Sequence, residues 1–463
     1  MKKLESFKRL IVIGMSGVCL GVQVLIYAYF WQKFYFLDVK KYLPFWERGH
    51  WLIIGIYAVL LLFFSNMYGG MRVGYKKNAE VIFSQVFATL AVNVITYFQL
   101  SLMVLQLYYF PIYAAMAALQ ILWVIVWIFA AGFIYRNVFP PRRLLLVHGD
   151  RPIDAILDKF ASRRDKFEVC KCMHVSAGVD AVNAEALERY DAVVLWDIDD
   201  RERNKIMKFC YGQGIRIYIM PKIPDVIMKG SEELHIFDTP LFLTREYCLT
   251  IEQRFIKRCI DLVCASILLV LASPFMILTA LFVKLYDGGP VLYKQVRCTT
   301  GGREFQILKF RSMRVDAEKD GVARLASKGD ARITPVGKVI RKVRLDELPQ
   351  LINIFKGDMS FIGPRPERPE IIRQYLEVMP EFAFRMKVKA GLAGYAQVYG
   401  KYNTTPYDKL KLDLAYIENY SVWLDIKLML LTLKVLFWPD STEGIDSDQM
   451  TALKKEKEKD VGM

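Results

Sequence analysis

Four long apolar stretches in the first 140 residues constrain this chain more than any other feature of its sequence. They cover approximately residues 10–31, 51–68, 80–100 and 109–134. Each is close to the ~20 apolar residues that an α-helix needs to cross a bilayer. The first is longer than the core of a cleavable signal and has no small-residue cleavage site, so we interpret it as an anchor. The sequence therefore predicts a membrane α-helical N-terminal bundle over residues 1–140.

Basic residues predict that both ends of this bundle face the cytoplasm. Lysine and arginine precede the first stretch and follow the second and the fourth, although the connection between the first two stretches is also basic. Such residues are enriched in cytoplasmic loops. The net charge of +15 indicates anionic partners such as phospholipid head groups, nucleotides or nucleic acid. The interiors of the stretches hold almost no ionisable residues, which argues against a transporter because such residues mark a substrate path.

Residues 141–250 change to short apolar runs separated by amphipathic segments. The runs RRLLLVHG, KFEVCKCMHV, YDAVVLWD and IRIYIMP suit buried parallel strands, and Asp154–Ala161 and Arg201–Tyr211 suit helices between them. This alternation predicts an α/β Rossmann-like domain. Its first run ends in HGDRP and lacks the glycines that admit a pyrophosphate, which favours a structural or regulatory role over nucleotide binding. CKCMH resembles a metal-binding spacing, but no second ligand pair follows, so alternation along a strand is the preferred interpretation.

Residues 251–440 begin with an apolar stretch from Cys259 to Val283 that contains Ser273 and Pro274. Proline removes a backbone hydrogen bond and clashes with the preceding turn, so we expect a sharp kink. A kinked helix that crosses the membrane would place all later residues outside the cell. A helix that breaks here and turns back would keep them in the cytoplasm, and the basic residues at both ends of the stretch favour this re-entrant arrangement.

The chain ends with one more apolar run and a charged tail. Asp425, Lys427 and Lys434 interrupt the run, which suits a helix lying in the membrane interface better than one that spans it. The composition of residues 441–463 predicts a disordered tail.

Three clusters of charged residues within residues 251–440 are candidates for chemistry. They lie in the segments ILKFRSMR, GKVIRKVRLDELPQL and GPRPERPE. Their residues are Lys309, Arg311 and Arg314 in the first; Lys338, Arg341, Lys342, Arg344, Asp346 and Glu347 in the second; and Arg365, Glu367 and Arg368 in the third.

Arginines on a proline-fixed backbone are well suited to bidentate contacts with phosphate. An acid next to them should have a depressed pKa and stay ionised, so that it can bind a metal, act as a base or attack phosphorus. Asp346 and Glu347 also lie near an expected helix start, where such residues cap helices or form ion pairs. Spacing alone therefore leaves catalysis and a structural role equally open for this acid pair.

Several substrate classes fit poorly. The chain has no P-loop and no protein-kinase motifs, which argues against transfer from ATP. Nucleic acid is disfavoured because the basic clusters follow a membrane-inserted stretch and no aromatic-studded ribbon accompanies them. What remains is a cationic site with a carboxylate pair at the inner leaflet, suited to a soluble anionic substrate and a lipid phosphate.

The region from about residue 257 to 439 resembles the bacterial sugar transferases, the monotopic polyprenyl-phosphate hexose-1-phosphate transferases. The resemblance rests on KFRSM, the Ser273-Pro274 break and the order of these motifs, together with LDELPQL at Leu345–Leu351, FIGPRPERPE at Phe361–Glu370 and KAGLAGYAQVYG at Lys389–Gly400. With the N-terminal bundle and the Rossmann-like domain, the whole chain resembles the long form of the family. The resemblance implies a mainly α monotopic catalytic domain with a re-entrant helix over residues 251–440, facing the cytoplasm at the inner membrane of a bacterium.

The resemblance also implies a reaction. A UDP-sugar would give its sugar-1-phosphate to undecaprenyl phosphate and release UMP, in the first membrane step of capsule or exopolysaccharide synthesis. Asp346 would be the covalent nucleophile of a ping-pong cycle, and Glu347 would help to hold Mg²⁺ or position the acceptor. The implied substrate-binding residues are Lys309, which would also order the acid pair, and Arg311, Arg341, Arg365, Arg368 and Asp413.

Long-form relatives imply a homodimer, and glucose and galactose are the expected sugars. Two details depart from the family pattern and could loosen a loop: DGGP at Asp287–Pro290 stands where D-S-x-G-P is commoner, and Ala390 stands where proline is usual. Two rival functions stay open: a membrane glycosyltransferase that releases UDP, and a non-catalytic scaffold of polysaccharide assembly.

Overall fold

The computed structural model describes residues 5–42, 49–244, 248–314, 332–400 and 404–436. The chain divides into two compact units, Met1–Pro221 and Lys222–Met463. The domain limits predicted at residues 140, 250 and 440 stay predictions. The predicted tail of residues 441–463 lies outside the described residues.

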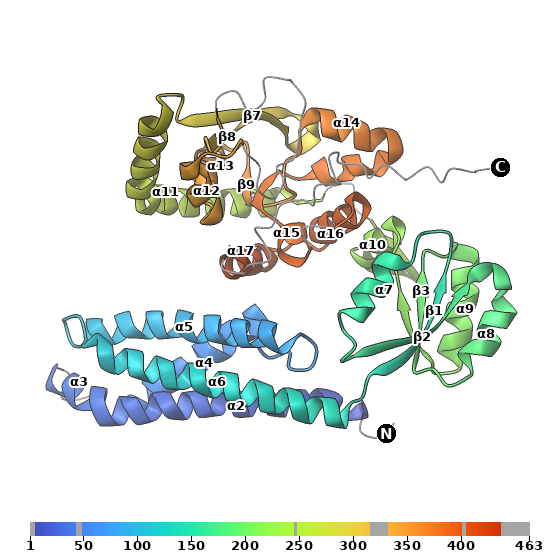
Figure 1. Ribbon diagram of the computed structural model, residues 1–463, viewed down its shortest axis with the longest axis horizontal. Coiled ribbons are helices and arrows are strands. Elements are labelled where there is room, and N and C mark those ends of the chain that lie inside the picture. Colours follow the sequence, from blue (N-terminus) through green and yellow to red (C-terminus); the bar gives the residue numbers. More distant parts are fainter. Residues whose placement is uncertain (1–4, 43–48, 245–247, 315–331, 401–403, 437–463) are drawn as a thin grey trace. The chain divides into compact units, whose positions relative to one another are not determined.

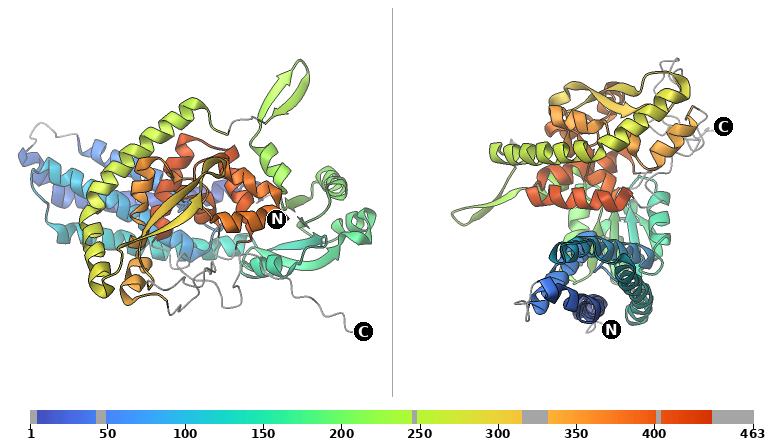
Figure 2. Two further views of the ribbon diagram at one scale, coloured as in Figure 1. Left: turned by 90° about the horizontal axis from the view of Figure 1, so that it is seen from above. Right: turned by 90° about the vertical axis from the view of Figure 1, so that its left-hand side faces the viewer.

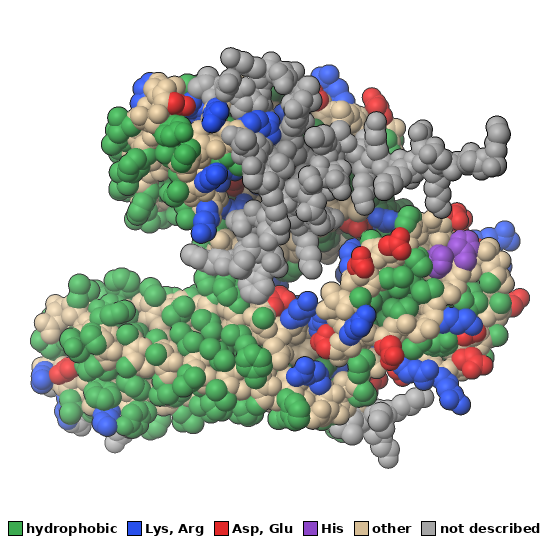
Figure 3. All heavy atoms as spheres, viewed as in Figure 1, with side chains coloured by type: hydrophobic (Ala, Val, Ile, Leu, Met, Phe, Trp, Pro, Cys, Tyr) green, Lys and Arg blue, Asp and Glu red, His purple; other side chains and the backbone are tan. Residues whose placement is uncertain are grey.

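The first unit begins with long apolar helices (Figure 1). Helix α2 continues through a π-helical turn into α3, so that together they form one apolar segment, Lys8–Tyr42. By length and composition this segment and the next three helices could each cross a membrane, which confirms the predicted apolar helices. Figure 3 shows hydrophobic side chains over most of the visible side of these helices. The bounds are α2 Lys8–Phe30, α3 Phe36–Tyr42, α4 His50–Tyr68, α5 Asn78–Met103 and α6 Phe110–Val138.

Neutral polar side chains hydrogen-bond to one another in the interior of these helices. Tyr57 Oη donates to Asn93 Oδ1 at 3.0 Å, and Asn93 Nδ2 donates to Gln120 Oε1 at 2.9 Å. Gln120 Nε2 donates to the backbone oxygen of Gln23 at 3.0 Å, and Thr89 Oγ1 donates to Gln23 Oε1 at 2.7 Å. All five residues except Asn93 are at most 2% exposed, and Asn93 is 4% exposed. The polar groups therefore satisfy one another where no water is available.

The rest of the first unit is a parallel sheet in the order β2-β1-β3-β4 with helices on both faces, as predicted in outline. Leu145 and Val147 pack with α8 and α9 on one face, while Leu144 and Leu146 pack with α7 on the other. The strands β1 and β3 are buried throughout their centres, which explains their continuous apolar sequence. The bounds are β1 Arg142–His148, α7 Asp154–Ala161, β2 Phe167–His174, α8 Val179–Ala186, β3 Ala192–Trp196, α9 Asp200–Gly212 and β4 Arg216–Ile219.

The second unit packs its helices around one apolar core that includes Ile354, Phe382, Leu410, Tyr416 and Leu428. Two strand pairs border that core: β7 with β8, which are antiparallel, and β9 with β10, which are parallel. The bounds are α10 Ile223–Lys229, β5 Glu232–Ile236, β6 Thr239–Leu243, α11 Ile251–Asp287, β7 Leu292–Cys298, β8 Glu304–Phe310, α12 Pro335–Lys342, α13 Gln350–Lys356, β9 Ser360–Ile362, α14 Pro369–Val378, β10 Gly391–Ala393, α15 Tyr395–Tyr399, α16 Pro406–Glu418 and α17 Val422–Leu436.

Helix α11 is the fifth segment that is long and apolar enough to cross a membrane. It passes through Pro274 as one helix and bends sharply along its length (Figure 2). Large apolar side chains on both sides of the proline are exposed, among them Val270 at 73% and Ile277 at 70%. A helix with so much exposed apolar surface is suited to insertion in lipid.

Candidate active site

The acid pair lies in a short turn between two helices. Helix α12 ends at Lys342, and Arg344 then adopts a left-handed backbone conformation with φ 56°. A single 3₁₀ turn, Leu345–Glu347, follows and leads into α13. Positive φ is uncommon for arginine and is often found at functional sites. This turn directs two neighbouring carboxylates into different surroundings.

Glu347 is held by two cations from distant parts of the unit. Lys309 Nζ on β8 lies 3.0 Å from Glu347 Oε1, and Arg365 Nη2 lies 2.9 Å from the same oxygen. Arg344 Nη1 lies 4.0 Å from the other oxygen. Burial alone would raise the pKa of Glu347, but these positive charges outweigh it and hold the pKa well below its usual range. Glu347 is therefore a fixed anion.

Asp346 has a different environment. Burial, and then the negative charge of Glu347, raise the pKa of Asp346 to about 6, although Lys309 and Arg341 partly oppose this. Within the described part of the chain, we find no side chain that donates a hydrogen bond to its carboxylate. The predicted depressed pKa thus holds for Glu347 and is wrong for Asp346, because sequence spacing did not reveal that the cations pair with Glu347. Asp346 is the acid with unoccupied oxygens.

Arg365 lies in a loop that also contains Glu367, the centre of a second cluster of charged residues. Glu367 contacts Lys409 Nζ and lies 3.7 Å from both Arg297 Nη1 and Arg385 Nη1. Burial would raise the pKa of Glu367, but Lys409, Arg385 and Arg297 together lower it to about 2. The alternating prolines of this loop limit the freedom of its backbone, so the cluster and the prolines together fix the position of Arg365.

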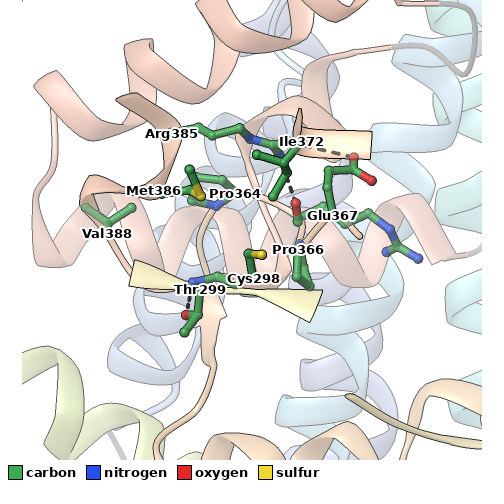
Figure 4. Close-up of a pocket in the computed structure, with 11 residues that line it drawn as sticks. Cys298, Thr299, Pro364, Pro366, Glu367, Ile372, Arg385, Met386 and Val388 are labelled. Atoms are coloured by element: carbon green, nitrogen blue, oxygen red, sulfur yellow. Dashed lines mark hydrogen bonds and ion pairs between the residues drawn. The ribbon is translucent and has the colours of Figure 1, made fainter. Parts of the chain in front are cut away.

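Arg385 was not identified from the sequence, yet it joins this cluster to Asp413. It is 3% exposed, and its Nη2 donates to the backbone oxygen of Arg365 at 2.8 Å. The same nitrogen lies 2.9 Å from Asp413 Oδ2, an ion pair without a well-aligned hydrogen bond. Figure 4 shows Arg385 and Glu367 beside a small pocket bordered by Pro364, Pro366 and other residues. Asp413 is 1% exposed, so its ion pair with Arg385 is shielded from solvent.

The other predicted site residues occupy several places. Arg341, in the last turn of α12, is half-buried, and its positive charge partly opposes the rise in the pKa of Asp346. Arg368 is half-buried at the start of α14. Arg311 is 8% exposed, and its guanidinium donates a hydrogen bond to Asp287 at the end of α11. Ser273 and Pro274 lie within α11, where Ser273 Oγ donates to the backbone oxygen of Val270.

The acid pair could contribute to a metal site only together with other ligands. Among the described residues, no group of three or more His, Cys, Asp or Glu side chains is arranged to hold a metal ion. Mg²⁺ commonly binds through one or two carboxylates and completes its shell with substrate phosphates and water. Asp346 and Glu347 fit that kind of donor set, with Asp346 supplying the unoccupied oxygens.

Comparison with known proteins finds similarity in this part of the chain. Residues 252–439 match the family described as bacterial sugar transferase. A UDP-N-acetylgalactosamine-undecaprenyl-phosphate N-acetylgalactosaminephosphotransferase of Aeromonas hydrophila is 39% identical over 54% of this chain and 59% of its own length. UDP-glucose:undecaprenyl-phosphate glucose-1-phosphate transferases of Escherichia coli and Caulobacter vibrioides are 39% and 40% identical over 44% and 40% of this chain. The match covers 44% of the first enzyme and 71% of the second, so the chain spans about half the length of several relatives that it matches.

Proposed function

Since this chain belongs to the bacterial sugar transferase family, we propose that it transfers a sugar-1-phosphate from a UDP-sugar to undecaprenyl phosphate and releases UMP. The observation that carries this proposal is the division between two adjacent acids. Glu347 is neutralised by Lys309 and Arg365, whereas Asp346 keeps its carboxylate unoccupied beside the same cations. A structural ion pair would not need a second, half-buried acid that has no hydrogen-bonded partner among the described side chains.

The proposed chemistry has two steps. A carboxylate oxygen of Asp346 attacks the phosphorus that bears the sugar, the bond to the bridging oxygen breaks, and UMP leaves with that oxygen. An oxygen of undecaprenyl phosphate then attacks the same phosphorus and displaces the Asp346 carboxylate. One phosphoanhydride is exchanged for another, so the overall reaction needs no separate energy source.

The surrounding residues have defined roles in this proposal. Arg365 and Arg368, on a proline-fixed loop, bind phosphate oxygens, and Arg341 and Lys309 contribute positive charge around Asp346. With a pKa of about 6, Asp346 is about 90% ionised at pH 7. Asp346 and Glu347 would hold Mg²⁺, which when bound neutralises charge on the diphosphate.

The membrane arrangement is part of the same proposal. We infer that α11 enters the inner membrane, bends near Pro274 and returns, so that the catalytic unit stays in the cytoplasm. Its exposed apolar surface and its bend support this. In this view the parallel sheet of the first unit is a Rossmann-like domain with a structural or regulatory role. The placement of α17 in the interface is not proposed, because Asp425 and Lys434, which suggested it, are buried inside the unit.

A homodimer is also proposed, and the β5–β6 hairpin supports it. The hairpin is a two-stranded sheet whose apolar residues Phe237 and Phe242 are 98% and 67% exposed, and it projects in Figure 2. Isolated two-stranded hairpins are marginally stable in water, so this hairpin would gain stability if its exposed apolar residues packed against another surface. A second copy of the chain would supply that surface.

The leaving nucleotide tests the proposed reaction. Purified full-length protein in lipid nanodiscs with undecaprenyl phosphate and Mg²⁺ would be given UDP-glucose, UDP-galactose and UDP-N-acetylgalactosamine separately. We expect UMP and a lipid diphosphate-sugar with one of the two hexoses, glucose being preferred. UDP as the leaving nucleotide would establish the rival glycosyltransferase, and no turnover with any UDP-sugar would favour the scaffold.

A further inference from the structure

The end of α11 is joined to the strand that carries Lys309. Arg311 directly follows β8, and its Nη1 donates to Asp287 Oδ2 at 2.8 Å while Nη2 contacts the other carboxylate oxygen. Asp287 is the last residue of α11. The guanidinium is 7% exposed, so this two-point contact is shielded from water. Arg311 thus has its guanidinium occupied by a protein carboxylate.

The backbone at the end of α11 leaves room for this contact. A Cβ atom at Gly289 would lie 2.6 Å from Arg311 Nη1, so any side chain there would push the guanidinium away. Gly288 ends the helix with φ 70°, a conformation that glycine adopts without strain. The two glycines of DGGP therefore have separate structural effects: Gly288 ends the helix, and Gly289 leaves space for the Arg311 guanidinium.

An apolar cluster runs from the same helix end to the acid pair. Val283 of α11, Phe310 of β8 and Ile340 of α12 are buried against one another. Leu345 and Leu348, which flank Asp346 and Glu347, pack on this cluster. Lys309 lies two residues before Arg311, and it holds Glu347. The helix end, the strand and the acid turn are thus connected by both ion pairs and packing.

We propose that the Asp287–Arg311 pair is a positioning device that sets where the acid pair lies relative to the membrane-inserted part of α11. The inference rests on the proposed function, because it assigns the pair to one half of that reaction. The UDP-sugar arrives from water and its transfer to Asp346 does not depend on depth. The phosphate of undecaprenyl phosphate lies at a depth that is set by its membrane-embedded chain. Transfer of the sugar-1-phosphate to this lipid therefore requires Asp346 to lie at the matching depth, which the Asp287–Arg311 pair would fix.

Replacing Arg311 by glutamine separates the two halves. Exchange of labelled UMP into UDP-sugar reports the first half, and transfer to undecaprenyl phosphate in nanodiscs reports the second. We expect exchange to stay within about twofold of the parent and KM for undecaprenyl phosphate to rise about tenfold or more, the scale of a small misplacement of reactants. The Asp287→Asn variant should behave alike, and the double variant should be no worse than either single one.

Arg303→Gln is the matched control, since it removes an exposed ion pair with Asp358 at the other end of the same strand pair. We expect both half-reactions to be unchanged in it. Parallel loss of exchange and transfer in Arg311→Gln, or no change in either, would overturn the inference. Absence of exchange in the parent protein would instead overturn the covalent cycle on which it rests.

Discussion

The two units of this protein bury polar side chains in opposite ways. Inside the N-terminal helices the buried groups are neutral, and Tyr57, Asn93 and Gln120 share their hydrogen bonds. Inside the second unit many of the buried polar groups are charged, as in the pairs Lys257–Asp425 and Arg385–Asp413. Charges are costly in lipid, so amides and hydroxyls hold the membrane helices together. The second unit keeps charges, several of them in ion pairs, whereas the half-buried Asp346 accepts no hydrogen bond from a side chain of the described residues.

This difference sets Asp346 apart from the paired acids of the second unit. Burial raises the pKa of Asp413 and Asp425 as well, but each of these acids has a cation beside it, Arg385 or Lys257, whereas Asp346 has no hydrogen-bonded cation in the described part of the chain. Burial and the negative charge of Glu347 together raise the pKa of Asp346 to about 6. A group kept in such a state is a candidate for chemistry rather than for stability.

The largest expected effect comes from removing that acid. Asp346→Asn keeps the side-chain size and removes the nucleophile, so turnover should fall by more than about a thousandfold, the scale seen when a covalent nucleophile is lost. A donor labelled in the phosphate next to the sugar should leave protein-bound label in the parent and none in the variant. Retained turnover would remove support for the covalent mechanism.

The next effect concerns a structural charge pair. Lys257 Nζ lies 2.5 Å from Asp425 Oδ2, and both side chains are at most 10% exposed. Asp425→Asn leaves a buried cation without its partner, which should cost about 3–5 kcal/mol in unfolding free energy. Thermal denaturation in detergent measures this. Replacement of both partners by apolar residues of similar size should recover much of the loss; if the double variant is as unstable as the single one, the pair is not the cause.

The pH dependence of activity tests the state of Asp346. Because its pKa is raised to about 6, protonation below that pH removes the nucleophile, and kcat/KM should fall about tenfold per pH unit. The same shift affects stability. The folded state binds the proton more tightly than the unfolded chain, so Asp346 lowers stability as pH rises from 3.8 to about 6. Asp346→Asn should therefore have a higher thermal midpoint than the parent at pH 7.5, and this advantage should shrink at pH 5.

The smallest expected effect lies in the membrane helices. Gln120→Leu removes donors and an acceptor from the network with Tyr57 and Asn93, at a cost of about 1–2 kcal/mol by analogy with hydrogen bonds between membrane helices. Gln106→Leu, at an exposed position, is the control. The thermal midpoint should fall in the first variant alone. UMP exchange at low temperature should be unchanged in both, since the network lies outside the catalytic unit.

The candidate site was predictable in part. The sequence predicted Lys309, the acid pair and Arg365 as site residues from the motifs KFRSM, LDELPQL and GPRPERPE. The structure brings these residues together. Arg385 gave no signal, because a lone arginine in FAFRMK has no pattern that distinguishes it from a surface residue. Arg311 was assigned to substrate binding, but the structure joins it to Asp287, a partner 24 residues away that spacing does not identify.

Hydrophobic length and periodicity are local properties, so the sequence was enough to predict the apolar helices and the parallel strands, although it did not reveal the β5–β6 hairpin. The different environments of the two acids could not be predicted from the sequence, because they depend on how the chain folds. Asp346 and Glu347 are neighbours with the same charge, and their difference comes from Lys309 and Arg365, which reach one of them from other elements. Electrostatic energy depends on distances through space, and those distances are set only when the chain folds.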